Sequence, residues 1–205
     1  MKRLMALMLA LVCLMMPVLT LAISVDPWYN GMSSGSWTYE DGVTRDNTYG
    51  YPQSAKLLQR LATRSGPSTN YDELGSYHKK GYEVQVYSKA YDERNGIWWL
   101  QVEFTYGDTL RRAYTGLKRV DIDIDTVPEE YPIYTAKVSA ETVGFYGPGT
   151  HYARHKGTVE VTTVGTIYAF EDGWAHFEYY DTDKECYRRV WMDAGCLNWT
   201  GKSKY

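Results

Sequence analysis

Two stretches of the chain alternate between apolar and polar residues, which is the pattern of a half-buried β-strand. Residues 83–87 read Glu-Val-Gln-Val-Tyr, and residues 98–104 read Trp-Trp-Leu-Gln-Val-Glu-Phe. Neighbouring side chains of a strand point to opposite faces. In the second stretch the predicted core face consists of Trp98, Leu100, Val102 and Phe104, and the outward face consists of Trp99, Gln101 and Glu103.

After about residue 55 the chain consists of short strand-like stretches divided by Gly and Pro, and helical periodicity is weak. Short strands at close spacing with turn residues between them are typical of a small β-barrel. A later stretch repeats the alternation, with Ala175, Phe177 and Tyr179 on the core face and Trp174, His176 and Glu178 on the outward face. The pattern therefore predicts an all-β fold.

Four blocks of sequence recur in the same order, which indicates an internal repeat. The matches are Gly66-Pro67-Ser68-Thr69-Asn70-Tyr71 with Gly147-Pro148-Gly149-Thr150-His151-Tyr152, Val84 and Val86 with Val159 and Val161, Trp99-x-x-Val102-Glu103 with Trp174-x-x-Phe177-Glu178, and Arg111-Arg112-Ala113-Tyr114 with Arg188-Arg189-Val190-Trp191. Acidic residues and a proline at residues 121–130 are typical of a linker between the two copies. We therefore expect two tandem barrels, at 55–125 and 131–199.

The start of the chain differs in character from the rest. Residues 1–22 have a basic beginning, an apolar run and a small residue at the end, which predicts a secretory signal peptide; an uncleaved anchor helix is the alternative. Residues 23–54 are rich in Gly, Ser, Asn, Asp, Thr and Tyr without a lasting period, so we expect a flexible leader there. These features predict a secreted or envelope-associated protein.

Charge narrows the range of partners. Without Lys2 and Arg3 the chain has 20 basic against 25 acidic side chains, a formal charge of −5. A mildly acidic chain does not attract nucleic acid or an anionic membrane. No segment after the signal peptide is apolar enough to span a bilayer. The 20 Tyr and 7 Trp, against 4 Phe, suit twisted sheets and binding faces.

The outward face predicts a ligand site. An outward Trp99 or Trp174 would expose a large apolar area and would need a ligand, the other barrel or the leader to cover it. Beside these two, the candidate ligand-binding residues are Gln101, Glu103, Tyr71, Tyr77, Arg111 and Arg112. The arginines suit a carboxylate, although such pairs commonly contact local acids instead. Tyr71 also suits a role in closing the end of its own barrel.

Cys186 and Cys196 are either a disulfide or two buried thiols, since an exported chain allows both. His151 and His155 follow a Gly-Pro-Gly turn and do not lie on a helix, which would arrange them with His176 and the cysteines around zinc. No nucleophile, acidic pair or phosphate-binding loop appears in the context that catalysis requires. We therefore expect no cofactor, no metal and no enzyme activity.

The first copy resembles the bacterial SH3 (SH3b) family. Residues 61–68 resemble its Arg-x-Gly-Pro-Ser opening turn, and residues 95–102 resemble its Asn-Gly-Trp strand. The second copy is degenerate and has Phe145 in the place of Arg64. The resemblance implies SH3-like barrels and a non-catalytic module that binds cell-wall peptides or another exported protein. Because Trp99 faces outward by strand parity and the first copy keeps Arg64, we expect any ligand to bind beside Trp99. The alternative is a structural or assembly protein of the envelope with no small ligand.

Overall fold

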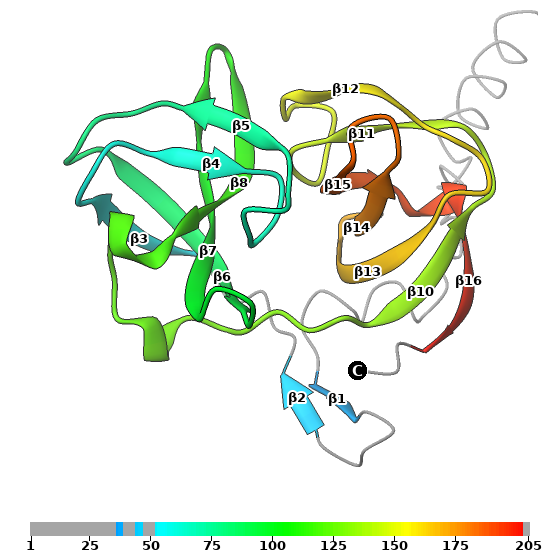
Figure 1. Cartoon of the computed structure of the whole chain (residues 1–205), viewed down its shortest axis with the longest axis horizontal. Helices are drawn as coiled ribbons and strands as arrows, with labels where there is room; N and C mark the ends of the chain where they lie inside the picture. The colour runs from blue at the N-terminus through cyan, green and yellow to red at the C-terminus, as the bar shows by residue number, and fades with distance from the viewer. Residues whose placement is uncertain (1–35, 39–43, 47–51, 203–205) are drawn as a thin grey trace, which may run out of the picture. The chain divides into compact units, whose positions relative to one another are not determined.

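The computed structural model describes residues 36–38, 44–46 and 52–202 (Figure 1). The predicted signal peptide and most of the predicted leader lie outside these residues. The described part of the leader contains two strands, β1 (Ser36–Thr38) and β2 (Thr44–Asp46), which pair antiparallel. Among the described residues there is no α-helix, only the 3-10 turns η1 (Leu117–Arg119), η2 (Ile124–Thr126) and η3 (Ala194–Cys196). The predicted all-β fold is confirmed for this part of the chain.

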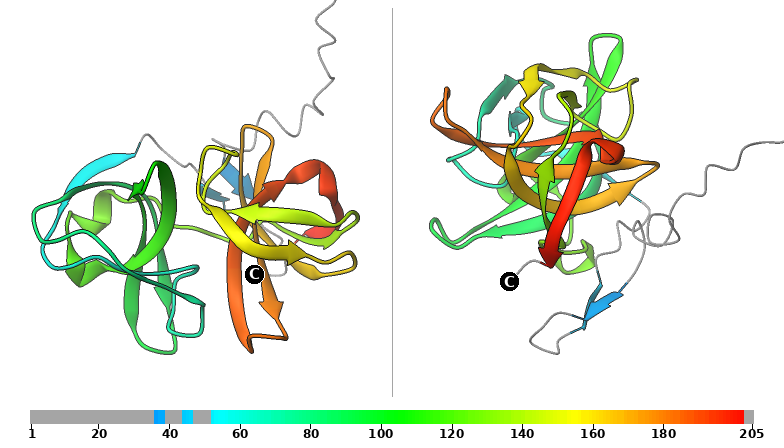
Figure 2. Two further views of the ribbon diagram at one scale, coloured as in Figure 1. Left: turned by 90° about the horizontal axis from the view of Figure 1, so that it is seen from above. Right: turned by 90° about the vertical axis from the view of Figure 1, so that its right-hand side faces the viewer.

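The first of two seven-stranded antiparallel sheets has the strand order β5-β4-β8-β7-β6-β3-β9. Its strands are β3 (Gln53–Leu57), β4 (Ala62–Arg64), β5 (Glu73–Ser76), β6 (Glu83–Asp92), β7 (Ile97–Tyr106), β8 (Thr109–Gly116) and β9 (Val120–Asp121). The sheet is strongly curved (Figure 2). It encloses a core that includes Leu57, Leu61, Val84, Val86, Leu100, Val102 and Phe104.

The second sheet has the strand order β12-β11-β15-β14-β13-β10-β16. Its strands are β10 (Tyr134–Val138), β11 (Thr142–Phe145), β12 (Arg154–Val159), β13 (Val164–Glu171), β14 (Trp174–Asp181), β15 (Cys186–Asp193) and β16 (Leu197–Lys202). Fully or almost fully buried apolar residues of these strands include Ala136, Ile167, Phe177, Val190 and Met192.

The two sheets share one topology, strand for strand, so the sequence repeat is also a structural repeat. In this order β13, and not β12, is the counterpart of β6. Val86 pairs with Val102, and Ile167 pairs with Phe177. Val102 and Phe177 are matched in the repeat, so Val86 and Ile167 hold the same place. Val159 lies in β12. The predicted match of Val84 and Val86 with Val159 and Val161 is therefore wrong.

The Gly-Pro turns of the repeat place a tyrosine ring against a glycine. A Cβ atom added to Gly66 would lie 2.1 Å from the ring of Tyr71, and one added to Gly147 would lie 2.0 Å from the ring of Tyr152. No side chain fits at either position. The turn therefore needs glycine because the tyrosine five residues later folds back over it, and this fixes where each tyrosine hydroxyl lies.

The segment that joins the sheets packs against the first one. Val127 belongs to the first core, and the amide of Lys89 donates to the carbonyl of Pro128 at 2.8 Å. The amide of Glu130 in turn donates to the carbonyl of Lys89 at 2.8 Å. The linker is therefore held along β6 by backbone hydrogen bonds and by a buried apolar side chain.

Candidate functional site

The face of β7 opposite the core, which the sequence predicted to need a ligand, the other barrel or the leader as cover, is covered in the structure. Trp99, Gln101 and Glu103 lie on the predicted side of the strand, away from the core cluster. Trp99 is nevertheless only 7% exposed and Gln101 only 1%. Strand parity therefore identified the face correctly, and of the two alternatives for Trp99, a ligand platform or a covered side chain, the low exposure favours the covered one. The second sheet covers much of this face.

One arginine of the first sheet carries much of the contact. The guanidinium of Arg112 lies 2.8 Å from the carboxylate of Glu103 and 2.6 Å from that of Glu171, which belongs to the second sheet. It also donates to the hydroxyl of Tyr152 at 3.1 Å. That hydroxyl donates to Glu103 at 2.6 Å. The predicted ligand groups Glu103 and Arg112 therefore bind each other and the second sheet.

The equivalent arginine of the second sheet repeats the arrangement. Arg189 lies 2.5 Å from Glu178 of its own sheet and 2.7 Å from Glu130, which follows the first sheet. The hydroxyl of Tyr71 donates to Glu178. Tyr71, Glu178 and Arg189 thus correspond to Tyr152, Glu103 and Arg112 with the two sheets exchanged. We call this two-fold contact between the sheets the seam.

Backbone pairs complete the seam in the same reciprocal manner. Tyr71 forms a parallel bridge with Tyr187 of β15, and Tyr152 forms one with Leu110 of β8. The loop after each Gly-Pro turn thus lies along a strand of the other sheet. In the sequence Tyr71 and Tyr152 follow the turns, but no pattern around them indicates that each reaches the opposite copy.

Burial and charge act together on the groups of the seam. Burial alone would lower the pKa of Arg112, but the hydrogen bond and charge of Glu171 raise it above its ordinary value. Burial raises the pKa of Tyr87, whose ring stacks on Arg112 at 3.7 Å, to about 12. The arginine therefore stays charged and the tyrosine neutral across the physiological range.

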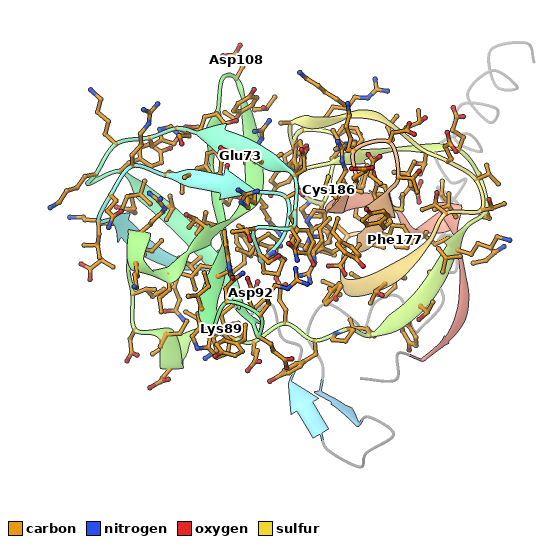
Figure 3. The ribbon with its side chains drawn as sticks, in the orientation of Figure 1. Glu73, Lys89, Asp92, Asp108, Phe177 and Cys186 are labelled. Atoms are coloured by element: carbon orange, nitrogen blue, oxygen red, sulfur yellow. The ribbon has the colours of Figure 1, made fainter. Side chains whose placement is uncertain are left out.

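A groove of about 640 Å³ on the first sheet remains open. Its lining includes Ile97, Trp98, Trp99, Leu117, Arg64 and Glu73. Trp98, predicted in the core, is instead half-buried outside the core cluster, with its ring 5.1 Å from the Lys89 ammonium. The carboxylate-bearing side chain of Glu73, labelled in Figure 3, is 67% exposed. The groove thus combines an apolar aromatic wall with charges of both signs.

The equivalent place on the second sheet is occupied by an aromatic pair. Phe145, which replaces Arg64 in the repeat, packs edge-to-face on Trp174 with ring centroids 5.3 Å apart. Trp174 is half-buried as a result. Tyr77, a predicted ligand-binding residue, does not line the groove that contains Trp98 and Trp99. Its hydroxyl instead accepts a hydrogen bond from Arg111 at 2.7 Å.

Cys186 and Cys196 are free thiols. Cys186 begins β15, and Cys196 follows the end of that eight-residue strand. A strand rises about 3.3 Å per residue, so the two residues are separated by roughly three times the distance of about 7 Å between Cα atoms that a bridge allows. Of the two alternatives that the sequence left open, the structure therefore shows free thiols, half-buried rather than buried.

Comparisons of the chain with protein-family models, with curated proteins and with solved structures gave no match. The described residues hold no group of three or more His, Cys, Asp or Glu side chains placed to bind a metal ion. Within the same residues, no helix has the length and apolar character needed to cross a membrane.

Proposed function

We propose that this chain is an exported, non-catalytic binding module that recognises cell-wall peptides or another exported protein, and that the groove of the first sheet is its binding site. The observation that carries this proposal is the groove in which the half-buried Trp98 and Leu117 lie over the buried Trp99, beside the Arg64–Glu73 ion pair at 3.5 Å. Aromatic rings supply apolar area at low entropic cost, and charges of both signs match the amines and carboxylates of wall peptides.

We further propose that each sheet, with its closing turns, is an SH3-like barrel of the bacterial SH3 (SH3b) type. The identical strand order of the two sheets and the Gly-Pro turns at equivalent places support this. The proposal assigns binding to the first copy, because Phe145 and Trp174 pack on each other in the second.

The seam favours a second candidate function, that of a structural or assembly protein of the envelope without a small ligand. Gln101, Glu103 and Arg112, which the sequence offers for ligand binding, are buried there or paired with protein groups. In that case the aromatic groove would contact another protein, and purified wall would not retain the chain.

Retention on purified peptidoglycan, with a variant of the groove, tests the proposal. Trp98→Ala removes half of the aromatic wall without opening the core, so binding is expected to fall about tenfold while the melting temperature changes little. Tyr180→Ala, an exposed tyrosine of β14, is the matched control and should bind as the parent does. Failure of the parent to bind wall would overturn the wall-peptide proposal and favour the assembly function.

A further inference from the structure

A second cavity, of about 820 Å³, is lined by residues of both sheets. Its lining includes Arg111 and Tyr106 of the first sheet and Tyr146, His155 and Arg188 of the second. The β7–β8 hairpin, with Asp108 at its tip in Figure 3, bounds one side through Tyr106 and Thr109. Of the residues that line the groove of the first sheet, only Glu73 also lines this cavity.

Arg111 is a buried cation in the wall of this cavity. It is only 6% exposed, and its guanidinium lies 3.7 Å from the ring centroid of Tyr106 and 4.7 Å from that of Tyr146. One of its nitrogens donates to the Tyr77 hydroxyl, whereas its Nε atom is buried without a hydrogen-bond partner. Among the described residues, no carboxylate forms an ion pair with it.

The equivalent arginine shows what Arg111 lacks. Arg188 pairs with Asp181 at 3.0 Å on its own sheet and with Asp72 at 3.5 Å on the other. In the pairing register, Tyr106 ends β7 where Asp181 ends β14. Ala153 follows Tyr152 as Asp72 follows Tyr71. Around Arg111 both acidic partners are thus replaced, one by a tyrosine and the other by an alanine.

A second donor without a partner lies at the same wall. Arg188 can only donate, so His155 accepts its hydrogen bond at Nε2 and carries its own proton on Nδ1. That Nδ1 atom is buried with no hydrogen-bond partner among the described residues. The rings of Tyr146 and His155 lie 5.8 Å apart, and Tyr146 also stacks on Arg111. One aromatic ring therefore brings the two donors together.

We propose that this cavity binds a small carboxylate, with Arg111 supplying the positive charge and His155 a neutral donor. A buried cation without a counter-charge is unfavourable, and a planar carboxylate matches the donor fork of a guanidinium. The ionised residues that line the cavity balance, with five acidic and five basic side chains. Recognition therefore rests on direct contact with Arg111 rather than on long-range attraction.

Calorimetric titration of the full chain tests the proposal with two probes, N-acetyl-dialanine and succinate, and with N-acetyl-dialanine amide as the uncharged control. At least one carboxylate should bind and the amide should not. Binding of the peptide alone would identify a peptide C-terminus as the source of the carboxylate, and binding of succinate alone an organic acid. Binding of neither up to about 10 mM, a value that already corresponds to very weak affinity, would overturn the proposal.

Two variants locate the site. Arg111→Gln should weaken carboxylate binding about tenfold or more, as expected for a lost charge-assisted hydrogen bond. Ala153→Asp gives Arg111 the acidic partner that Asp72 provides for Arg188 in the equivalent position. The new carboxylate should therefore abolish ligand binding while raising or keeping the melting temperature. This second variant decides the matter if Arg111→Gln fails to fold. Undiminished binding in the folded Ala153→Asp protein would contradict the proposal. Trp98→Ala, in the groove, should leave carboxylate binding unchanged whether or not wall binding exists.

Discussion

At the scale of single residues, His155 is a base that the fold keeps neutral. It is only 3% exposed, and Arg188 donates to its Nε2 atom. Burial and the neighbouring Arg188 cation lower the pKa of His155 to about 4, from an ordinary value of 6.5. His176, stacked on Trp191, also has a pKa well below its ordinary value because of burial and the nearby arginines.

Acid should therefore destabilise the protein through His155. The unfolded chain binds a proton at this residue near pH 6.5, whereas the folded chain does so only near pH 4, so the free energy of unfolding falls as the pH drops through this window. The loss attributable to His155 is about 3 kcal/mol. His155→Gln keeps an acceptor for Arg188 and should remove the part of this fall that is due to His155, while the part due to His176 remains. Urea unfolding at pH 7 and pH 4.5 gives the free energy of unfolding at each pH. An equal loss of this free energy in parent and variant between the two pH values would contradict the prediction.

The candidate site was predictable only in part at this scale. Strand parity identified the side of β7 on which Gln101 and Glu103 lie. It contained no information on what covers that side, because the partners Tyr152 and Glu171 come from the other copy of the repeat. Contacts between positions some 50 residues apart or more depend on tertiary packing and not on local pattern.

At the scale of elements, the strands followed from alternation, and the repeat located their counterparts except in β6. The two valines of that strand were matched to Val159 and Val161 by spacing. The β6–β7 hairpin (residues 83–106) is six residues longer than its counterpart β13–β14 (residues 164–181), so the spacing that relates Trp99 to Trp174 does not hold for Val86. Both central pairs also contain a bulge, between Val86 and Ser88 and between Ile167 and Ala169. Spacing shifts with each such insertion, whereas pairing register does not.

The contacts of the linker reverse what its sequence predicts about proteolysis. Its acidic and proline residues predict an early cleavage site near residues 126–130. In the fold, Val127 is buried and the amide of Glu130 donates to the carbonyl of Lys89. Proteases need an extended, detachable segment, so this linker should resist them.

Limited digestion with a protease specific for glutamate should therefore cut first after exposed turn residues such as Glu93 and Glu185. Glu129 and Glu130 should be cut late, because the linker must first leave β6. Mass spectrometry of the early fragments distinguishes the two orders. A pair of fragments that divide at residues 129–130 before any other cut appears would show that the linker is not held as described.

At the scale of the whole described chain, the seam makes the two sheets depend on each other. Arg112 holds one acid from each sheet, and Arg189 repeats this with Glu178 and Glu130. Removing one partner from a buried ionic group leaves uncompensated charge, which costs about 3–5 kcal/mol. The sheets should therefore unfold together.

Arg112→Met tests this dependence, since it leaves Glu103 and Glu171 without their cation. The free energy of unfolding should fall by about 3 kcal/mol. In scanning calorimetry the parent should show one transition, and the variant a broadened or divided one. Lys118→Met, at an exposed position, is the control and should stay within about 0.5 kcal/mol of the parent. Two separate transitions in the parent would mean that the sheets are independent.

The reciprocal bridges of the seam have a further consequence for aggregation. Leu110 and Tyr187 each present backbone groups of a strand to a loop of the opposite sheet. If the seam opened while both sheets stayed folded, these strand segments would lose their neighbours and become templates for pairing with another molecule. The loop of each copy therefore covers a strand edge of the other copy. Conditions that open the seam without unfolding the sheets should be those under which the protein aggregates fastest.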